Sequence, residues 1–426
     1  MNTQSLRPVA VVGGVRTPFC RSNTAYSDLS NKDMLATALQ GLSERFNLKG
    51  EQVDEVFAGA VVSHSRDWNL AREAVLSTDL SPLTPGVTLQ QACGTSLQAA
   101  MVSAAKIASG QIDSAIAAGS DTTSDAPIVV GDKLRKRLIK LGRARSFKDR
   151  LKLFKGFGLR ELAPVPPGTG EPRTGMSMGQ HCELMAKEWG ITREDQDALA
   201  LASHQNAAAA YAAGFMDPLL TPCAGVLRDN NLRADSTLEA LAGLRNAYDK
   251  SDAGTLTAGN STPLTDGASS LLLASEEWAR ERGLPVLAYL THSRHSAVDF
   301  VAGEGLLMAP TVAVSEMLER AQMSLQDFDL YEIHEAFAAQ VLCTLKAWES
   351  DDYCRDRLGR DSALGAIDRS KLNVNGSSLA VGHPFAATGA RVLSAGAEAL
   401  NARGGGKCLV SVCTAGGMGC VAVLER

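Results

Sequence analysis

Two cysteines and two histidines stand in local settings that would support nucleophilic and acid–base chemistry. Cys93 lies in the segment Gln-Gln-Ala-Cys-Gly-Thr-Ser, just before a stretch with helical periodicity. The free amide groups and the dipole at the start of a helix favour a thiolate, so Cys93 is a candidate nucleophile. A buried, unreactive cysteine is the alternative, and on this segment alone it is the more common outcome.

His383 stands in a glycine-rich loop, between Gly382 and Pro384, directly ahead of another helical stretch. Such a loop lets the backbone approach a ligand closely. A capping or structural histidine is the alternative. The place of this loop in the internal repeat described below favours a functional role. His334 lies at the end of another predicted strand, and its neighbour Glu335 would point to the opposite face, where a buried structural ion is the simpler interpretation.

Cys413 follows an apolar run and precedes small residues whose backbone N–H groups could turn toward an oxyanion. A thiol with a reference pKa of about 8.5 can exchange protons when its neighbours tune it, so Cys413 is a candidate acid or base. Cys408 and Cys420 are more typical of packing residues. Their spacing from Cys413 does not match the CxxC pattern of zinc sites, so no metal site is expected.

Composition limits what kind of protein can position these residues. The chain has 426 residues, which at about 150 residues per domain suggests two or three packed units. Apolar residues make up 45% and charged residues 21%, which excludes disorder and collagen-like repeats, and the net charge of −5 argues against nucleic acid as a partner. No signal peptide or membrane span is evident, and the nine cysteines are an odd number, so we expect a cytoplasmic protein with reduced thiols.

Short apolar runs alternate with helical periodicity, the pattern of α/β proteins. The second half of the chain repeats the order of the first. The predicted elements are strands at 9–18, 53–62 and 115–121 and helices at 33–46 and 93–109, then strands at 328–337 and 408–417 and a helix at 389–400. Two such βαβ halves would bring their strand and helix ends, and the candidate residues at those ends, to a shared crevice.

Residues from about 126 to 254 interrupt this repeat and predict an inserted domain. Within it, Lys133 to Arg160 contains twelve Lys and Arg residues against a single acidic residue, Asp149, with apolar residues interleaved. This segment carries a charge of +11, so the rest of the chain carries −16. A turn-rich stretch follows at 163–172, and then a helical region at 177–214.

Five segments occur in the order and spacing of one family: Gln-Ala-Cys93-Gly-Thr, Thr257 to Gly267, His334-Glu-Ala-Phe, Gly382 to Arg391 and Cys413-Thr-Ala-Gly-Gly. Over essentially its whole length the chain resembles the thiolases. The His-Glu-Ala-Phe form, where many thiolases have Asn-Glu-Ala-Phe, and the basic insert are similar to the thiolase subunit of the trifunctional fatty-acid oxidation complex. Ala386 and Ala415 depart from the family pattern, in which glycine is common at both positions.

The resemblance implies an α/β thiolase fold, with duplicated βαβ halves in a five-layered αβαβα arrangement. It also implies roles: Cys93 is the acylated nucleophile, His383 its activating base, and Cys413 the group that moves the proton to and from the acetyl carbanion or the incoming thiol. His334 and His383 would donate to the thioester oxygen. The backbone N–H groups of Cys93 and Ala415 would hold the oxyanion of the tetrahedral adduct.

CoA thioesters are the substrates that the resemblance implies, with CoA as a co-substrate and no permanently bound cofactor. Thr262 stands where the family often has a serine near the pantetheine arm, and it keeps the hydroxyl. Met178 is expected on the wall of the pantetheine tunnel, although a core methionine is the simpler interpretation. Ala336 and Phe337 complete the expected substrate-binding set.

We expect 1–125 with 255–281 to form the N-terminal half, 126–254 an inserted loop domain, and 282–426 the C-terminal half. The family implies a homodimer or tetramer. The basic segment 133–160 has several interpretations: it binds the phosphates of CoA, lies on an anionic membrane, docks on a hydratase–dehydrogenase subunit, or is a solvated face. The resemblance favours a partner or a membrane.

The expected activity is cleavage of 3-ketoacyl-CoA by CoA in fatty-acid β-oxidation. Biosynthetic condensation of two acetyl-CoA molecules uses the same residues and is the alternative. A decarboxylating ketoacyl synthase would carry histidine in place of Cys413. A non-catalytic carrier or scaffold subunit would be expected to have lost Cys93, His383 or Cys413, and all three are present.

Overall fold

The structure is a computed structural model that describes residues 6–426. Its N-terminal half contains a mixed sheet with the strand order β4 (Gly86–Thr88), β3 (Glu55–Gly59), β5 (Ser114–Asp121), β8 (Thr265–Ser275) and β1 (Val9–Arg16). β3 runs parallel to β4 and β5, whereas β8 is antiparallel to both β5 and β1. The short strand β2 (Cys20–Arg21) pairs with the start of β8.

The C-terminal half repeats this arrangement with β10 (Leu330–Ile333), β11 (Lys407–Thr414), β12 (Met418–Glu425) and β9 (Ala288–Ala297), in that order. β10 is parallel to β11, and β12 is antiparallel to both β11 and β9, as in β3, β5, β8 and β1. Two residues of β1 pair with two of β9, so the halves share one continuous sheet. The repeated order predicted from the sequence is therefore present in the fold.

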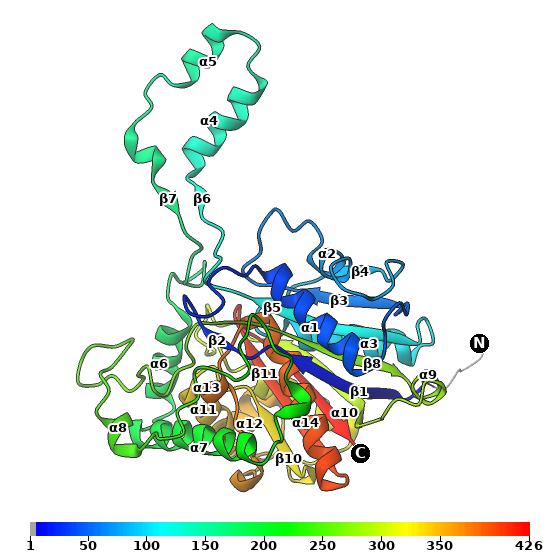
Figure 1. Ribbon diagram of the computed structural model, residues 1–426. Helices are drawn as coiled ribbons and strands as arrows, with labels where there is room; N and C mark the ends of the chain where they lie inside the picture. The colour runs from blue at the N-terminus through cyan, green and yellow to red at the C-terminus, as the bar shows by residue number, and fades with distance from the viewer. Residues whose placement is uncertain (1–5) are drawn as a thin grey trace.

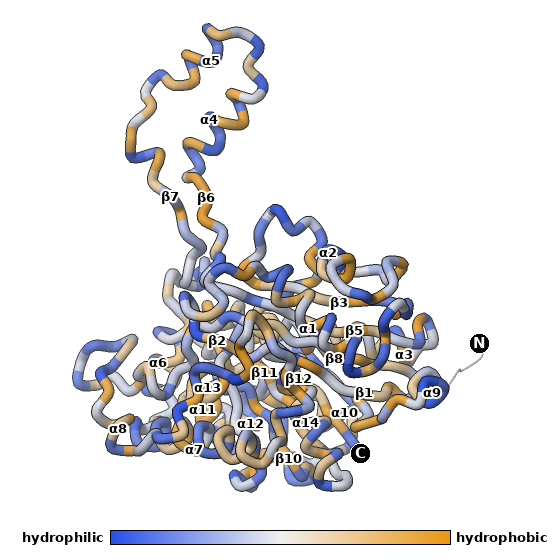
Figure 2. Tube along the Cα trace, viewed as in Figure 1, coloured by the Kyte–Doolittle hydropathy of each residue, from blue (hydrophilic) through white to orange (hydrophobic). Residues whose placement is uncertain are grey.

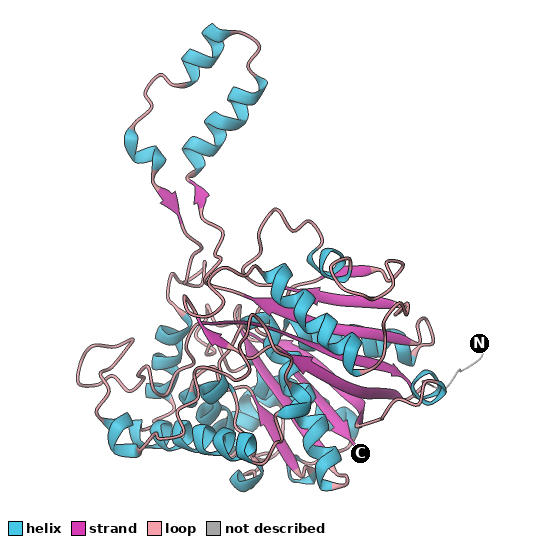
Figure 3. Ribbon diagram, in the orientation of Figure 1, coloured by secondary structure: helices cyan, strands magenta, loops and turns pink. Residues whose placement is uncertain are grey.

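Helices lie on both outer faces of this sheet and between its two halves (Figures 1 and 3). α1 (Asn31–Arg45) and α2 (Leu70–Val75) cover the N-terminal half, and α10 (Ala309–Ala321) and α11 (Ala338–Trp348) cover the C-terminal half. α3 (Thr95–Ala108) and α14 (Thr388–Arg403) pack on each other around a third, central hydrophobic core. The two halves of the sheet therefore act as two layers, and the order helix, sheet half, helix, sheet half, helix is the expected five-layered arrangement.

Local sequence features explain where these elements begin and how closely they pack. Ser30 accepts a hydrogen bond from the N–H of Asp33, whose carboxylate accepts one from the N–H of Ser30, and this capping box begins α1. Every residue of β1 is buried, as its continuous apolar run predicts. Gly389 of α14 lies against α3, where a Cβ would come within 2.3 Å of the Leu97 nitrogen, so glycine permits the packing of the two central helices.

A long insertion separates β5 from β8, whereas β11 and β12 are joined by a tight turn. The insertion contains α6 (Met178–Glu188), α7 (Arg193–Ala212) and α8 (Leu238–Ala242). α6 and α7 fall in the region predicted to be helical, and a turn at Gly190, with a φ of 58°, separates them. The residue boundaries predicted for the inserted domain and the two halves stay predictions.

The basic segment lies in an arm, residues 129–165, that projects from the body (Figure 1). The short strands β6 (Val129–Val130) and β7 (Pro164–Val165) pair at its base. Beyond them are α4 (Asp132–Arg143), α5 (Phe147–Leu153) and the 3-10 helix η1 (Leu159–Leu162). Hydrophobic and hydrophilic residues alternate along the arm (Figure 2), and Leu134 is the one buried residue of α4 and α5.

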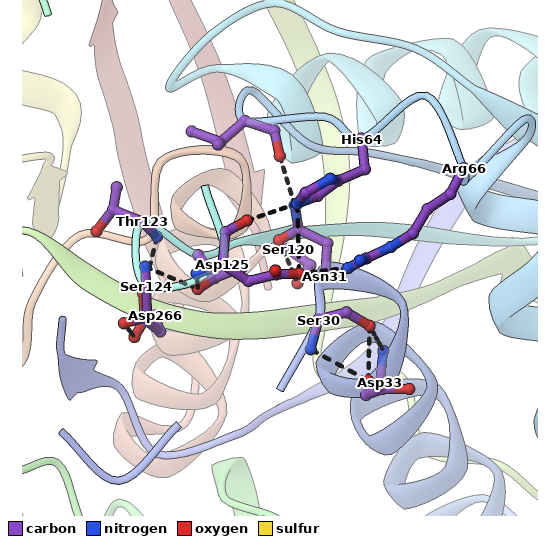
Figure 4. Close-up of polar contacts among 12 residues, drawn as sticks. Ser30, Asn31, Asp33, His64, Arg66, Ser120, Thr123, Ser124, Asp125 and Asp266 are labelled. Atoms are coloured by element: carbon purple, nitrogen blue, oxygen red, sulfur yellow. Dashed lines mark hydrogen bonds and ion pairs between the residues drawn. The ribbon is translucent and has the colours of Figure 1, made fainter. Parts of the chain in front are cut away.

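Polar contacts fasten the first residues of the insertion to the N-terminal half (Figure 4). His64 Nε2 lies 2.7 Å from the carbonyl oxygen of Asp125, and Arg66 forms an ion pair with the Asp125 carboxylate. The carboxylate of Asp266, in β8, accepts a hydrogen bond from the N–H of Thr123 at 2.9 Å. The residues that precede the arm are therefore held on the N-terminal half by hydrogen bonds and an ion pair.

Short helices complete the described part of the chain. They are α9 (Glu276–Glu281), α12 (Asp351–Leu358), α13 (Ser378–Val381), η2 (Asp217–Leu219), η3 (Leu325–Asp327), η4 (Arg369–Lys371) and η5 (Phe385–Ala387). α13 and η5 lie on either side of His383. From residue 6 to residue 426, no helix is long and apolar enough to cross a membrane.

Candidate active site

Cys93 lies in the connection from β4 to α3, two residues before the helix begins at Thr95. Its predecessor Ala92 has a φ of 45°, a left-handed conformation that is strained for alanine and fixes the direction of the chain at the cysteine. Desolvation raises the pKa of the Cys93 thiol to about 12, although the backbone N–H groups of Ala415 and of Cys93 itself oppose this shift. Desolvation of a charged sulfur thus favours the neutral thiol and acts against the thiolate expected at a helix terminus.

His383 faces Cys93 from the loop between α13 and η5. Its Nε2 lies 3.2 Å from Cys93 Sγ, and its Nδ1 lies 2.6 Å from the hydroxyl oxygen of Thr388, at the start of α14. Burial, together with the nearby Arg391 cation, lowers the pKa of His383 to about 3, so the ring is neutral. With Nδ1–H donated to Thr388, the lone pair on Nε2 is free to accept the thiol proton.

Cys413 lies near the end of β11 and is buried. Burial, and then the nearby Cys93 sulfur, raise its pKa well above the usual range. The turn that follows presents the N–H of Ala415 to Cys93. The next N–H, that of Gly416, donates to Oε1 of the buried Glu171 at 2.7 Å. A carboxylate of the insertion thus fixes this turn, and sequence analysis missed Glu171 because it sits in a turn-rich stretch without a motif.

His334 follows β10, and its ring centroid lies 4.1 Å from that of His383. Its Nδ1 lies 2.7 Å from Ser378 Oγ, whereas its Nε2 is buried with no partner among the described residues. Glu335 points elsewhere, as expected for the next residue of an extended chain, and its carboxyl group has a structural role. The Glu335 carboxylate accepts hydrogen bonds from the side chains of Ser203 and Asn373 and from the N–H of Leu379.

A second supporting carboxylate, Asp121 at the end of β5, was also missed from the sequence, where an aspartate ending a buried strand was the available signal. It accepts hydrogen bonds from two backbone N–H groups after β3 and, at 2.8 Å, from the N–H of Ala386. Burial raises its pKa to about 6. At Gly119 a Cβ would come within 2.0 Å of the Ala386 oxygen, so glycine lets the His383 loop lie directly on β5.

The residues expected to contact CoA lie together beside Cys413. Met178, Ala336 and Phe337 belong to one hydrophobic cluster with that cysteine. Thr262 joins them through Ala336, whose carbonyl oxygen accepts hydrogen bonds from the N–H of Thr262 at 3.1 Å and from its hydroxyl at 3.0 Å. The structure brings the four residues together, and their roles in binding stay predictions.

Comparison with known proteins places this geometry in a family. Residues 9–277 match the family model described as thiolase, N-terminal domain, and residues 284–426 match thiolase, C-terminal domain. The 3-ketoacyl-CoA thiolase of Yersinia pestis (strain Pestoides F) is 44% identical over 423 residues, which cover 98% of this chain and 96% of that protein. The 3-ketoacyl-CoA thiolase of Yersinia pseudotuberculosis serotype IB (strain PB1/+) has the same identity and coverage.

Solved structures agree with the sequence relatives. The acetyl-CoA acetyltransferase of Bacillus anthracis superposes with a TM-score of 0.82 at 30% identity, over 99% of this chain and 100% of that one. The human mitochondrial 3-ketoacyl-CoA thiolase in complex with CoA superposes with a TM-score of 0.80 at 28% identity, over 99% and 98%. Since the two family models together span nearly all of the sequence and these relatives align along their whole length, the chain belongs to the thiolase family.

Proposed function

We propose that this protein cleaves 3-ketoacyl-CoA with CoA, giving acetyl-CoA and a shortened acyl-CoA, in fatty-acid β-oxidation. The observation that carries the proposal is the 3.2 Å contact between Cys93 Sγ and His383 Nε2, beside the buried thiol of Cys413. A nucleophile with its own base and a separate thiol acid suits a reaction that breaks a carbon–carbon bond and transfers an acyl group.

In the first half-reaction, the Cys93 sulfur attacks the 3-keto carbon while His383 Nε2 accepts the thiol proton. The N–H groups of Cys93 and Ala415 donate to the resulting oxyanion. The bond between the second and third acyl carbons then breaks, and its electron pair forms the enolate of acetyl-CoA. Its oxygen accepts hydrogen bonds from His334 and His383, and its carbon takes the proton of Cys413.

In the second half-reaction, the Cys413 thiolate accepts the proton of the incoming CoA thiol, whose sulfur attacks the acyl group on Cys93. The tetrahedral adduct uses the same two N–H groups. Its collapse releases the shortened acyl-CoA, and the proton held by His383 returns to the Cys93 sulfur. Each thiol therefore ends in its starting protonation state, as a complete cycle requires.

Because both half-reactions are reversible, condensation of two acetyl-CoA molecules would use the same residues. The relatives named 3-ketoacyl-CoA thiolase, 44% identical, support cleavage over the acetyltransferase, which is 30% identical. A carrier or scaffold without activity is the candidate from another class, and the assembled contact between Cys93 and His383 argues against it.

A direct assay separates these candidates. The purified protein is incubated with acetoacetyl-CoA or with 3-ketohexadecanoyl-CoA, each with free CoA, and substrate loss is followed by enolate absorbance. We expect cleavage that Cys93→Ala abolishes, and the ratio of the two rates reports the chain-length preference. Absence of turnover with both substrates, in folded protein with an intact thiol, would refute the catalytic proposal in favour of a carrier.

We propose that the pantetheine arm of CoA passes along the cluster formed by Met178, Thr262, Ala336 and Phe337. Their packing beside Cys413 supports this, since the reacting sulfur of the bound CoA must reach that thiol. CoA acts as a co-substrate that is released after each cycle. Replacing Met178 by a bulkier tryptophan should raise KM for CoA, measured by initial rates at fixed 3-ketoacyl-CoA.

The arm supports a further part of the proposal, contact with an anionic membrane surface. It carries the basic segment and exposes large apolar side chains, among them Phe147 at 74% and Leu159 at 81%. Basic and apolar residues exposed side by side suit a lipid interface, where cations meet headgroups and apolar side chains enter the acyl boundary. An acidic protein partner is the other candidate for this surface.

Vesicle flotation tests the membrane contact. We expect binding to vesicles of phosphatidylglycerol and phosphatidylcholine, weakened by salt, and little binding to phosphatidylcholine alone. Replacing residues 133–160 by a short Gly-Ser linker should abolish binding while cleavage of acetoacetyl-CoA in solution continues. Failure of the intact protein to float with anionic vesicles would leave the protein partner as the better candidate.

We also propose a homo-oligomer. β4 is the end strand of the sheet, with Val87 exposed. Trp68 is 94% exposed, and its neighbour Asn69 donates a hydrogen bond to the Gly86 carbonyl oxygen in β4 at 2.8 Å. An open strand edge next to a large exposed aromatic residue suits pairing with a second copy. Light scattering on the purified protein measures its mass, and Trp68→Glu should weaken the association if this edge forms the contact.

A further inference from the structure

A chain of buried polar groups leads from the interior of the C-terminal half to His334. Arg391, in α14, donates a hydrogen bond from Nη2 to Ser378 Oγ at 2.6 Å and from Nη1 to Ser377 Oγ at 3.2 Å. Ser378 Oγ in turn lies 2.7 Å from His334 Nδ1. All of these residues are buried, so no bulk water competes for their hydrogen bonds.

The chemistry of these groups decides where the protons lie. A guanidinium only donates, so Ser378 Oγ is the acceptor of the bond from Arg391. The Ser378 hydroxyl then has its own proton to donate. Among its contacts within residues 6–426, the group that can accept this proton is His334 Nδ1. His334 is neutral, because burial, together with the neighbouring His383 and the Arg391 cation, holds its pKa well below the usual range. A neutral imidazole that accepts at Nδ1 carries its proton on Nε2.

Among residues 6–426 this Nε2–H group has no acceptor, although it is buried. Buried donors are nearly always satisfied, so one left open beside reacting groups is a place for a ligand atom. The His334 ring lies 4.1 Å from that of His383, whose Nε2 contacts the Cys93 sulfur. The open donor is therefore within the candidate active site rather than in an inert part of the core.

We propose that Ser378 and Arg391 are positioning residues that fix His334 as the Nε2–H tautomer, so that it donates a hydrogen bond to the carbonyl oxygen of the CoA thioester. The identity of that oxygen rests on the proposed function, whereas the tautomer is a property of the free protein. Ser378 selects the tautomer through its hydroxyl proton, and Arg391 orients that hydroxyl. The arrangement holds His334 as a ready donor before the substrate binds.

The two histidines are thereby set in opposite tautomers. As a base, His383 must offer a lone pair at Nε2, which assigns its proton to Nδ1, 2.6 Å from Thr388 Oγ1. His334 accepts a hydrogen bond at Nδ1 and presents an N–H group at Nε2, as a hydrogen-bond donor to the substrate must. An asparagine, which many thiolases have at this position, carries its N–H₂ group without any choice of tautomer.

The tautomer is tested by ¹⁵N NMR of the full chain labelled at histidine, without substrate. The His334→Asn variant identifies the His334 signals by their loss. We expect an unprotonated Nδ1 and a protonated Nε2, and a shift toward the other tautomer in Ser378→Ala. Ser377→Ala, which loses a contact with Arg391 but none with His334, should leave the signals in place. A protonated Nδ1 in the wild-type protein would overturn the proposal.

Kinetics test the consequence for catalysis. Ser378→Ala should lower kcat for 3-ketoacyl-CoA cleavage by about 10- to 100-fold with little change in KM, as expected for loss of an oriented donor. In the His334→Asn background the same substitution should change kcat by less than about threefold, because the coupled partner is gone. Ser378→Thr, which keeps the hydroxyl, should restore most of the activity.

An equal loss of kcat in both backgrounds would overturn the positioning role, because it would mean that Ser378 acts through packing alone. Thermal unfolding of each variant confirms that the comparison is made on folded protein. If the wild-type protein cleaves no 3-ketoacyl-CoA, the proposed function fails, yet the NMR measurement still decides the tautomer.

Discussion

The hydrogen bond between His383 Nδ1 and Thr388 Oγ1, 2.6 Å long, provides the sharpest test of the proposed base. Thr388→Val replaces the hydroxyl by a methyl group of similar size, so the start of α14 and the packing of the loop should be kept. The buried Nδ1–H then has no acceptor, so the tautomer with its proton on Nε2 becomes lower in free energy than the tautomer with its proton on Nδ1. A proton on Nε2 leaves His383 without the lone pair that accepts the proton of Cys93.

The size of the effect follows from the cost of this lost acceptor. Leaving a buried donor unsatisfied costs about 1–3 kcal/mol, which is the free energy by which the productive tautomer is disfavoured. At about 1.36 kcal/mol per tenfold change in rate, kcat should fall by about 5- to 160-fold. KM should change little, because Thr388 contacts the base rather than the substrate-binding cluster.

Steady-state cleavage of acetoacetyl-CoA measures the effect, and single-turnover acylation of Cys93 locates it in the first half-reaction. Thr388→Ser, which keeps the hydroxyl, is the matched control and should retain most of the rate. Equal rates for the valine variant and the wild-type protein would refute the assignment of His383 as a base oriented by this contact. So would a loss in Thr388→Ser as large as that in Thr388→Val.

Other predictions address the thiol, the turn and stability. With a pKa of about 12, Cys93 should be alkylated by iodoacetamide slowly at pH 7 and faster with rising pH; a plateau below about pH 9 would contradict this. Glu171→Ala should lower kcat about tenfold or more by freeing the β11–β12 turn, and Glu171→Gln, which keeps an acceptor, should lower kcat less. Asp229→Ala leaves the buried Arg16 cation without its carboxylate partner and should lower the free energy of unfolding by about 3–5 kcal/mol in denaturant titrations. Burial raises the pKa of Glu332 from 4.5 to about 8, so its contribution to stability should fall as pH rises across that interval, and Glu332→Gln should flatten the decline in Tm.

The sequence predicted strands and helices well where one local pattern decides the structure. The repeated βαβ order is present because each predicted strand is a short apolar run that is buried on both faces. Predicted strand ends were less accurate where a group distant in sequence competes with the neighbouring strand for backbone hydrogen bonds. The strand predicted at 53–62 ends at Gly59, since the N–H groups of Val61 and Val62 donate to the Asp121 carboxylate instead of to a neighbouring strand.

The candidate site residues were recognisable because each lies in its own motif, although Cys93 and His383 are 290 residues apart. The groups that support them were not, because their partners come from other parts of the chain. Glu171 and Asp121 become meaningful only when the fold places a turn or a loop against them. The desolvation that raises the pKa of Cys93 was not predictable for the same reason, since its extent depends on packing that no local motif encodes.

The duplicated topology explains why the insertion matters for the site although it is not part of the repeat. The insertion occupies the connection from β5 to β8, and the equivalent connection in the other half is the tight turn from β11 to β12 that carries Ala415. Glu171 reaches from the long connection to Gly416 in the short one, so the first half holds the β11–β12 turn of the second. Because Glu171 lies beyond the strand pair that closes the arm, removal of residues 133–160 leaves this contact in place. A truncation that also removes Glu171 should therefore impair acylation, whereas loss of the arm alone should not.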